Sequence, residues 1–98
     1  NANACTGDEG IKRTYLILGA LSKALGVPED QVLMCSTGVI GQQIPHERVI
    51  RSLPLLIESL SKDGLAQVSR AILTTDTREK TAKRAVTIEG KDVTILGI

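Results

Sequence analysis

The feature that most constrains this fold is a short apolar run, residues 31–36, which leads into a turn rich in glycine and hydroxyl side chains. The run carries no charge, which predicts a short strand buried on both of its faces. At its end Ser36 and Thr37 precede Gly38. Such a turn can hold N–H and O–H donors still, as an enzyme requires when charge develops on a carbonyl oxygen. On spacing alone an ordinary turn is the simpler interpretation, because clusters of Ser, Thr and Gly are frequent in loops.

Aromatic side chains are almost absent from the 98 residues: Tyr15 is the one tyrosine, and there is no Phe or Trp. Aromatic residues supply much of the buried area in small cores, so a chain that folds alone usually contains several. The length suits one small domain with a modest core. The sequence also starts without Met and stops on an apolar stretch. We therefore expect residues 1–98 to be a single segment of a larger or processed protein.

Charge and composition argue against several kinds of partner. Twelve basic and eleven acidic residues are interspersed, and no basic stripe indicates nucleic-acid binding. No apolar run is long enough to span a bilayer, and no signal peptide is visible. His46 is the one histidine, and Cys5 and Cys35 form no zinc-binding motif. We expect no metal and no cofactor, and we expect the two cysteines to be reduced thiols.

Helical periodicity predicts a first helix over residues 8–25. Thr6 and Glu9 have the spacing of a capping box at its start, and Gly26 is a typical helix stop. Apolar residues at three- and four-residue spacing predict one buried face. Its members are Ile11, Tyr15, Leu18, Leu21 and Leu25.

The second half of the chain predicts two further helices and a hairpin. A helix is expected to start at Pro45. At Pro54 it either kinks or gives way to a separate short helix that runs to Leu60, and we favour the break, because an internal proline costs about 3 kcal/mol and removes one backbone hydrogen bond. A short third helix follows around residues 65–72. Alternating apolar residues then predict a β-hairpin with its turn at residues 90–92. These elements indicate the α/β class.

A hydroxyl-rich stretch, Thr-Thr-Asp-Thr at residues 74–77, lies between the third helix and the hairpin. Thr and Asp side chains compete for backbone hydrogen bonds, so they favour a loop over a helix. A solvated loop is the simpler interpretation of this composition. A hydroxyl-lined pocket for a polar ligand is the alternative.

Three segments together resemble a known family. Residues 1–7 (Asn-Ala-Asn-Ala-Cys-Thr-Gly), 36–41 (Ser-Thr-Gly-Val-Ile-Gly) and 71–77 (Ala-Ile-Leu-Thr-Thr-Asp-Thr) occur in the order and at the spacing of the bifunctional ornithine acetyltransferase family, also called glutamate N-acetyltransferase, of arginine biosynthesis. Each motif alone is weak, whereas three in register are specific. The resemblance covers the whole chain.

The resemblance implies a two-chain enzyme of the N-terminal-nucleophile type. Family members are made as one precursor that cuts itself before a threonine, and this threonine becomes the nucleophile of the β chain. The acetyl group passes from N2-acetylornithine to that threonine and then to glutamate, and some members also use acetyl-CoA. The chain would be the later part of the α chain, with a sheet that the β chain helps to complete in an α2β2 assembly. The family is cytoplasmic in bacteria and mitochondrial in fungi.

The resemblance also assigns roles to three residues. The family's oxyanion hole falls on the Thr37 hydroxyl and the Gly38 backbone N–H, which are expected to stabilise the tetrahedral intermediates. Thr74 is expected to bind substrate, and Thr75 takes this role if the register differs by one. Asp76 is expected to be structural, and so is Ser36. The nucleophile has no counterpart within residues 1–98.

Two other functions fit the same residues. A related N-terminal-nucleophile aminopeptidase or amidase would use the oxyanion hole to hydrolyse its acyl-enzyme. A non-catalytic α/β module would use residues 74–77 to bind a polar metabolite. Loss of rate on replacement of Thr37 distinguishes an enzyme from a binding module, because an oxyanion hole acts on the transition state.

Overall fold

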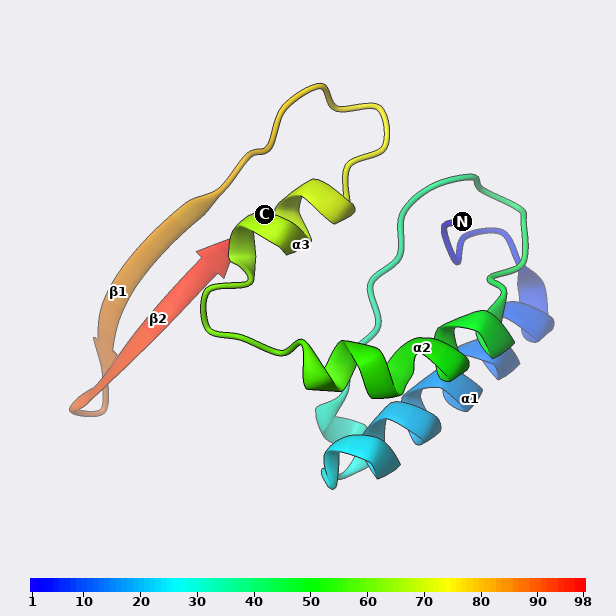
Figure 1. Cartoon of the computed structure of the whole chain (residues 1–98), viewed down its shortest axis with the longest axis horizontal. Helices are drawn as coiled ribbons and strands as arrows, with labels where there is room; N and C mark the ends of the chain where they lie inside the picture. Colours follow the sequence, from blue (N-terminus) through cyan, green and yellow to red (C-terminus); the bar gives the residue numbers. More distant parts are fainter. The chain divides into compact units, whose positions relative to one another are not determined.

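The computed structural model describes residues 1–98 and groups them into two compact units, Asn1–Ser61 and Lys62–Ile98 (Figure 1). The first unit contains helix α1 (Gly7–Leu25), the short 3-10 helix η1 (Glu29–Gln31) and helix α2 (His46–Glu58). The second contains helix α3 (Leu65–Ala71) and the antiparallel strands β1 (Ala82–Ile88) and β2 (Lys91–Gly97). This mixture of elements confirms the α/β class. None of the helices has the length and apolar character that crossing a membrane requires.

Helices α1 and α2 pack side by side in the first unit (Figure 1). The buried hydrophobic core is small and aliphatic, and it consists of Ile17, Ile44 and Leu53. Helix α1 ends where the sequence predicts. Gly26 takes the left-handed conformation, φ 68°, and its N–H bonds the Ser22 carbonyl oxygen.

The predicted capping box at the start of α1 is wrong. Thr6 is the N-cap residue but makes no side-chain capping bond, because its hydroxyl donates to Asn3 Oδ1 at 2.6 Å. Glu9 does not reach back to the cap, since its carboxylate pairs with Arg13 at 2.7 Å. Both side chains therefore have other polar partners, and the spacing alone could not exclude these competitors.

The predicted apolar face of α1 is only partly covered. Leu18 and Leu21 are half-buried, but Ile11 and Tyr15 are 58% and 62% exposed. The most buried positions of the helix are instead Gly10 and Ile17. Apolar residues occur on more than one side of α1, so periodicity identifies a stripe without saying which stripe a neighbour covers.

The predicted break at Pro54 is also wrong. Helix α2 runs unbroken from His46 to Glu58 with Pro54 inside it, and Pro45 is its N-cap residue. The neighbouring Leu53 is 5% exposed, and full burial of a leucine contributes roughly 1.5–3 kcal/mol. Packing of α2 in the first unit can therefore offset the cost of an internal proline, about 3 kcal/mol.

Residues 31–36 do not form the predicted buried strand. The backbone is extended at Val32 (φ −109°, ψ 126°), but the segment pairs with no other strand. Leu33 is 89% exposed. An extended segment becomes a strand only where a neighbour supplies ladder hydrogen bonds, and no other part of this chain does so.

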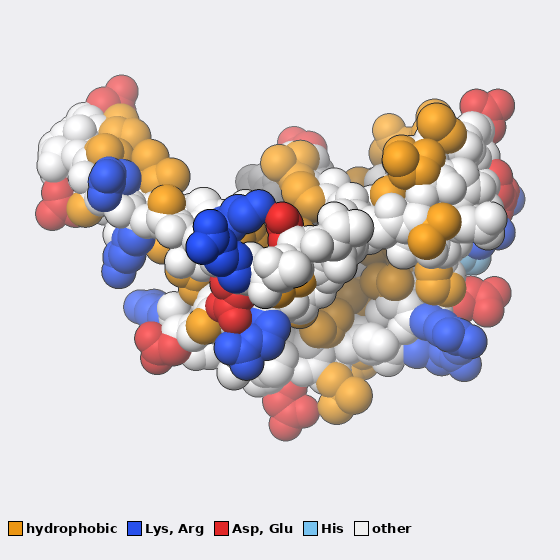
Figure 2. All heavy atoms as spheres, turned by 90° about the horizontal axis from the view of Figure 1, so that it is seen from above, with side chains coloured by type: hydrophobic (Ala, Val, Ile, Leu, Met, Phe, Trp, Pro, Cys, Tyr) orange, Lys and Arg blue, Asp and Glu red, His pale blue; other side chains and the backbone are white.

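The predicted hairpin is confirmed, with its turn one residue earlier. Glu89 and Gly90 form a two-residue turn with φ 50° and 75°, and Lys91 already pairs with Ile88 in the ladder. Two-residue turns with positive φ match the twist of the strands, which explains the shift. No helix of the second unit packs on this sheet, and Figure 2 shows hydrophobic side chains uncovered at the surface. Completion of the sheet by another chain stays a prediction.

Candidate functional site

The first unit brings together two of the three sequence motifs. Residues 1–4 run beside residues 36–41, joined by hydrogen bonds from the Ala2 N–H to the Val39 carbonyl oxygen (3.0 Å) and from the Gly41 N–H to the Ala4 carbonyl oxygen (2.9 Å). The N–H of Asn3 also donates to Ser36 Oγ at 2.9 Å. The turn that carries Thr37 and Gly38 is thus held on both sides by the N-terminal segment.

Gly38 is required by its backbone and by its neighbour. Its φ of +133° is rarely adopted by L-residues, and a Cβ there would lie 3.1 Å from both the Cα and the N of Asn1. The Gly38 N–H and the Thr37 hydroxyl have no hydrogen-bond partner within the chain, and both residues are exposed. Two neighbouring donors are therefore free for a ligand on a turn that is anchored at either side.

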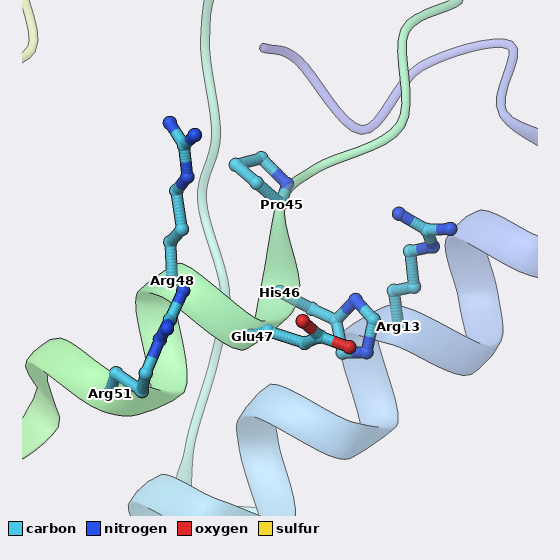
Figure 3. Close-up of a pocket in the computed structure, with 6 residues that line it drawn as sticks. All are labelled: Arg13, Pro45, His46, Glu47, Arg48 and Arg51. Carbon is cyan, nitrogen blue, oxygen red and sulfur yellow. The ribbon is translucent and has the colours of Figure 1, made fainter.

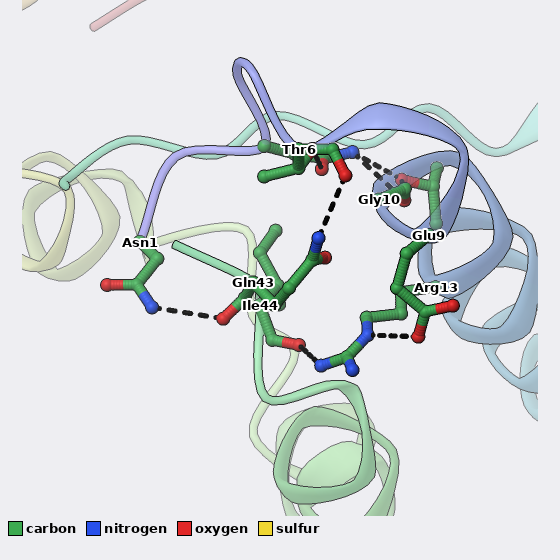
Figure 4. A network of polar contacts seen from close by, with 9 residues as sticks. Asn1, Thr6, Glu9, Gly10, Arg13, Gln43 and Ile44 are labelled. Carbon is green, nitrogen blue, oxygen red and sulfur yellow. Dashed lines mark hydrogen bonds and ion pairs between the residues drawn. The ribbon is translucent and has the colours of Figure 1, made fainter. Parts of the chain in front are cut away.

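A second network ties the loop before α2 to the start of α1 (Figure 4). Gln43 Nε2 donates to the Thr6 carbonyl oxygen at 2.8 Å, and Asn1 Nδ2 donates to the Gln43 carbonyl oxygen at 3.1 Å. Arg13 Nη1 donates to the Ile44 carbonyl oxygen at 3.1 Å. The far end of the loop is therefore held by Asn1, by the N-cap residue of α1 and by Arg13 of α1.

Arg13 also lowers the pKa of its neighbour on α1, Glu9. Its Nε donates to Glu9 Oε1 at 2.7 Å, and this hydrogen bond holds the pKa of the Glu9 carboxyl below its usual value. Glu9 stays ionised and keeps the guanidinium oriented toward the Ile44 carbonyl oxygen. This ion pair is accessible to solvent, so its contribution is orientation more than stability.

Thr74, the third predicted site residue, belongs to the second unit. It is exposed in the loop after α3 and makes no hydrogen bond within the chain, and the same holds for Thr75. The Asp76 carboxylate pairs with Lys80 Nζ at 2.7 Å. Because Thr37 lies in the first unit, a site shared with Thr74 stays a prediction.

Glu79 anchors the end of this loop to α3. Its carboxylate accepts hydrogen bonds from Arg70 Nε and from the buried Ser69 hydroxyl, each at 2.9 Å. These bonds, first from Arg70 and then from Ser69, lower the pKa of Glu79 below its usual value. A small hollow of about 230 Å³ opens beside these groups, lined in part by Ser69, Asp76 and Lys80, and Thr74 is not among its lining residues.

A hollow that no sequence motif predicts lies where α2 begins (Figure 3). It measures about 280 Å³. Its lining residues are Arg13, Pro45, His46, Glu47, Arg48 and Arg51. Figure 3 shows Arg48 and Arg51 directed away from the group formed by Arg13, His46 and Glu47. None of the predicted site residues lines this hollow.

The sequence predicts a structural role for Ser36 and no particular role for Asn3. The structure places both in direct contact with the predicted oxyanion turn or with its support. The recurrence of Asn1 and Asn3 before the first helix was the available signal. Both cysteines, Cys5 and Cys35, are free and exposed, and no group of three or more potential metal ligands gathers in the chain.

The arrangement defines a segment of an α/β protein with an exposed, anchored donor turn. The chain belongs to the ArgJ family, since the family model matches residues 1–98. This confirms the resemblance to the ornithine acetyltransferases of arginine biosynthesis.

Curated relatives share the name arginine biosynthesis bifunctional protein ArgJ. The one from Caldanaerobacter subterraneus subsp. tengcongensis is 42% identical over 99% of this chain and 24% of the relative, and the one from Prochlorococcus marinus subsp. pastoris is 46% identical over 98% and 24%. The chain thus spans about a quarter of the length of these relatives. A crystal structure of ArgJ from Bacillus halodurans matches with a TM-score of 0.75 and 34% identity, over 98% of this chain and 50% of that one.

Proposed function

We propose that the protein to which this segment belongs is a glutamate N-acetyltransferase, which transfers the acetyl group of N2-acetylornithine to glutamate. The observation that carries this proposal is the pair of free neighbouring donors, the Thr37 hydroxyl and the Gly38 N–H, on a turn anchored at both sides. Membership of the ArgJ family supports it, because the relatives are named as bifunctional proteins of arginine biosynthesis. Their bifunctional name also supports a second, acetyl-CoA-dependent N-acetylation of an amino acid.

The two donors would act on the charge that forms during acyl transfer. When a threonine Oγ attacks the acetyl carbonyl carbon, the C=O electron pair moves onto oxygen. The threonine proton goes to the base and then to the departing amine of ornithine. The Thr37 hydroxyl and the Gly38 N–H would hydrogen-bond the resulting oxyanion, and again when the α-amine of glutamate attacks the acetyl-threonine. Loss of one such donor typically lowers the rate about 10²- to 10³-fold.

The nucleophile would be the N-terminal threonine of a β chain cut from the same precursor. The lengths of the relatives support this arrangement. Nearly all of this chain aligns in each comparison, yet it covers 24% of a curated relative and 50% of the crystallised chain. The crystallised chain is therefore about half as long as the curated sequence, as expected for a protein made in one piece and present as two. Residues 1–98 would be the later part of the α chain of an α2β2 assembly.

Thr74 would contribute a hydroxyl to substrate binding, with Thr75 as the alternative. Exposure of both hydroxyls and the absence of competing partners within the chain support this role. The proposed substrates are amino acids in free or acetylated form, and the proposed location in a bacterium is the cytoplasm.

The test uses the full-length protein that carries this segment. Its intact mass under denaturing conditions should show two chains, the second beginning with threonine. Ornithine should be released from N2-acetylornithine in step with N-acetylglutamate, and T37A should lower kcat about 10²-fold with KM little changed. Release of acetate at the same rate without glutamate would instead indicate an amidase. An unchanged rate in T37A would refute the assignment of the oxyanion hole.

A further inference from the structure

Asn3 connects helix α1 to the proposed oxyanion turn. Its side chain is bound entirely to the start of α1: Nδ2 donates to Thr14 Oγ1 at 2.7 Å and to the Gly10 carbonyl oxygen at 3.3 Å, and Oδ1 accepts from Thr6 Oγ1 at 2.6 Å. Its backbone N–H points the other way, to Ser36 Oγ at 2.9 Å. One residue therefore spans the distance between a helix and the residue that precedes Thr37.

The contact between Asn3 and α1 depends on the absence of a side chain at Gly10. A Cβ at this position would overlap Thr6 Oγ1 and would come within 2.5 Å of Asn3 Oδ1. Gly10 is among the most buried residues of α1, although its own φ does not require glycine. The glycine is thus explained by close packing of the asparagine on the helix.

Ser36 receives the other end of this connection. Among the backbone N–H groups of residues 1–4, only that of Asn3 donates to a side chain, and its acceptor is the Ser36 hydroxyl. The flanking backbone bonds, from Ala2 to Val39 and from Gly41 to Ala4, begin one residue beyond Gly38. The bond from Asn3 to Ser36 is therefore the contact that fixes the turn on the side of Thr37.

We propose that Asn3 is a positioning residue for acyl transfer, which aims the Thr37 hydroxyl and the Gly38 N–H through its hydrogen bond to Ser36. This inference rests on the proposed function. It deepens that function by naming what holds the donors in place. Misplacement of catalytic groups by about 1 Å can lower a rate on the order of 10²-fold, so a connection of this kind can act on kcat without touching substrate.

The experiment measures kcat and KM of the full-length enzyme with N2-acetylornithine and glutamate in six variants. S36A removes the acceptor, S36T keeps it, and N3D keeps the backbone N–H but loses both side-chain donors. S36A and N3D should each lower kcat about ten- to a hundredfold with KM within about twofold, and S36T should restore most of the rate. S52A serves as a matched control, because Ser52 is an exposed serine bonded to a carbonyl oxygen of its own helix, and it should leave kcat unchanged.

The remaining two variants, T37A and the double mutant S36A/T37A, separate positioning from a general loss of structure. If Ser36 positions the Thr37 hydroxyl together with the Gly38 N–H, S36A should lower kcat by a clearly smaller factor in the T37A background than in the wild-type background, and the loss that remains is the share of the Gly38 N–H. An equal loss of kcat on S36A in both backgrounds would overturn the positioning role, and so would an unchanged kcat in S36A and N3D. In either case a rate loss in T37A would still support the proposed function. If T37A itself has full activity, both the proposed function and this inference fail.

Discussion

A Cβ on Gly38 would lie 3.1 Å from the Cα of Asn1, so the predicted oxyanion turn and the N-terminal segment approach each other so closely that a side chain at residue 38 would displace Asn1. The contact joins two motifs, and its two residues are more than thirty positions apart in sequence. The left-handed φ of +133° at Gly38 adds to the same requirement.

We expect Gly38→Ala to disturb the turn through both effects. The backbone conformation costs about 1–3 kcal/mol for a residue with a side chain, and the contact with Asn1 forces the N-terminal segment to shift. Denaturant unfolding and kcat should both change. Gly26→Ala is the matched control, because Gly26 also has positive φ but nothing within 4 Å of its added Cβ, and it should cost about 1–2 kcal/mol with kcat unchanged. A G38A enzyme with normal kcat would contradict the assigned role.

Gly10→Ala should destabilise the first unit by about 1–3 kcal/mol, because the new methyl group overlaps the hydroxyl of Thr6 and crowds Asn3. Gly19→Ala, in the same helix, is the control. Its added Cβ would meet only the flexible end of Glu29, at 3.3 Å, and alanine favours helix by about 1 kcal/mol. Thermal unfolding of the two variants should therefore move in opposite directions. Equal shifts would mean that helix propensity alone governs both positions.

Thr74→Val removes a hydroxyl while it keeps the shape of the side chain. If this hydroxyl binds substrate, KM for N2-acetylornithine should rise roughly two- to tenfold, as expected for one neutral hydrogen bond. Thr75→Val is the matched comparison, and its KM should stay unchanged. The reverse result would move the binding role to Thr75. If KM is unchanged in both variants, this loop does not bind the substrate.

The carboxyl group of Glu79 should titrate below its usual pKa of 4.5 in the folded protein, since Arg70 and Ser69 donate hydrogen bonds to its ionised form. A lowered pKa in the folded state stabilises the fold at pH values above 4.5. This contribution is lost as the pH falls from about 4.5 through the folded-state pKa. NMR titration of the side-chain carboxyl carbon measures the midpoint directly. Arg70→Gln should raise the midpoint toward 4.5, and an unchanged midpoint would rule out Arg70 as the main cause.

Local sequence patterns alone determined much of the secondary structure and the family. The periodicity of residues 8–25, the stop at Gly26 and the alternation in the hairpin depend on near neighbours, so the structure confirms them. The three motifs identified the family for a similar reason, because they specify residue types at given spacings.

Only the tertiary structure decided which alternatives these patterns realise. In the folded chain Ile17 is the buried residue of α1 and Tyr15 is exposed, and α2, which packs on α1, continues through Pro54. The Thr6 hydroxyl donates to Asn3 and makes no bond to the start of the helix. The Asn3 N–H in turn donates to Ser36, which lies 33 residues later in the chain. Residues 31–36 stayed unpaired because no neighbour supplied a ladder. Each outcome depends on contacts between residues far apart in sequence, and the energies of these contacts rival the local preferences that oppose them.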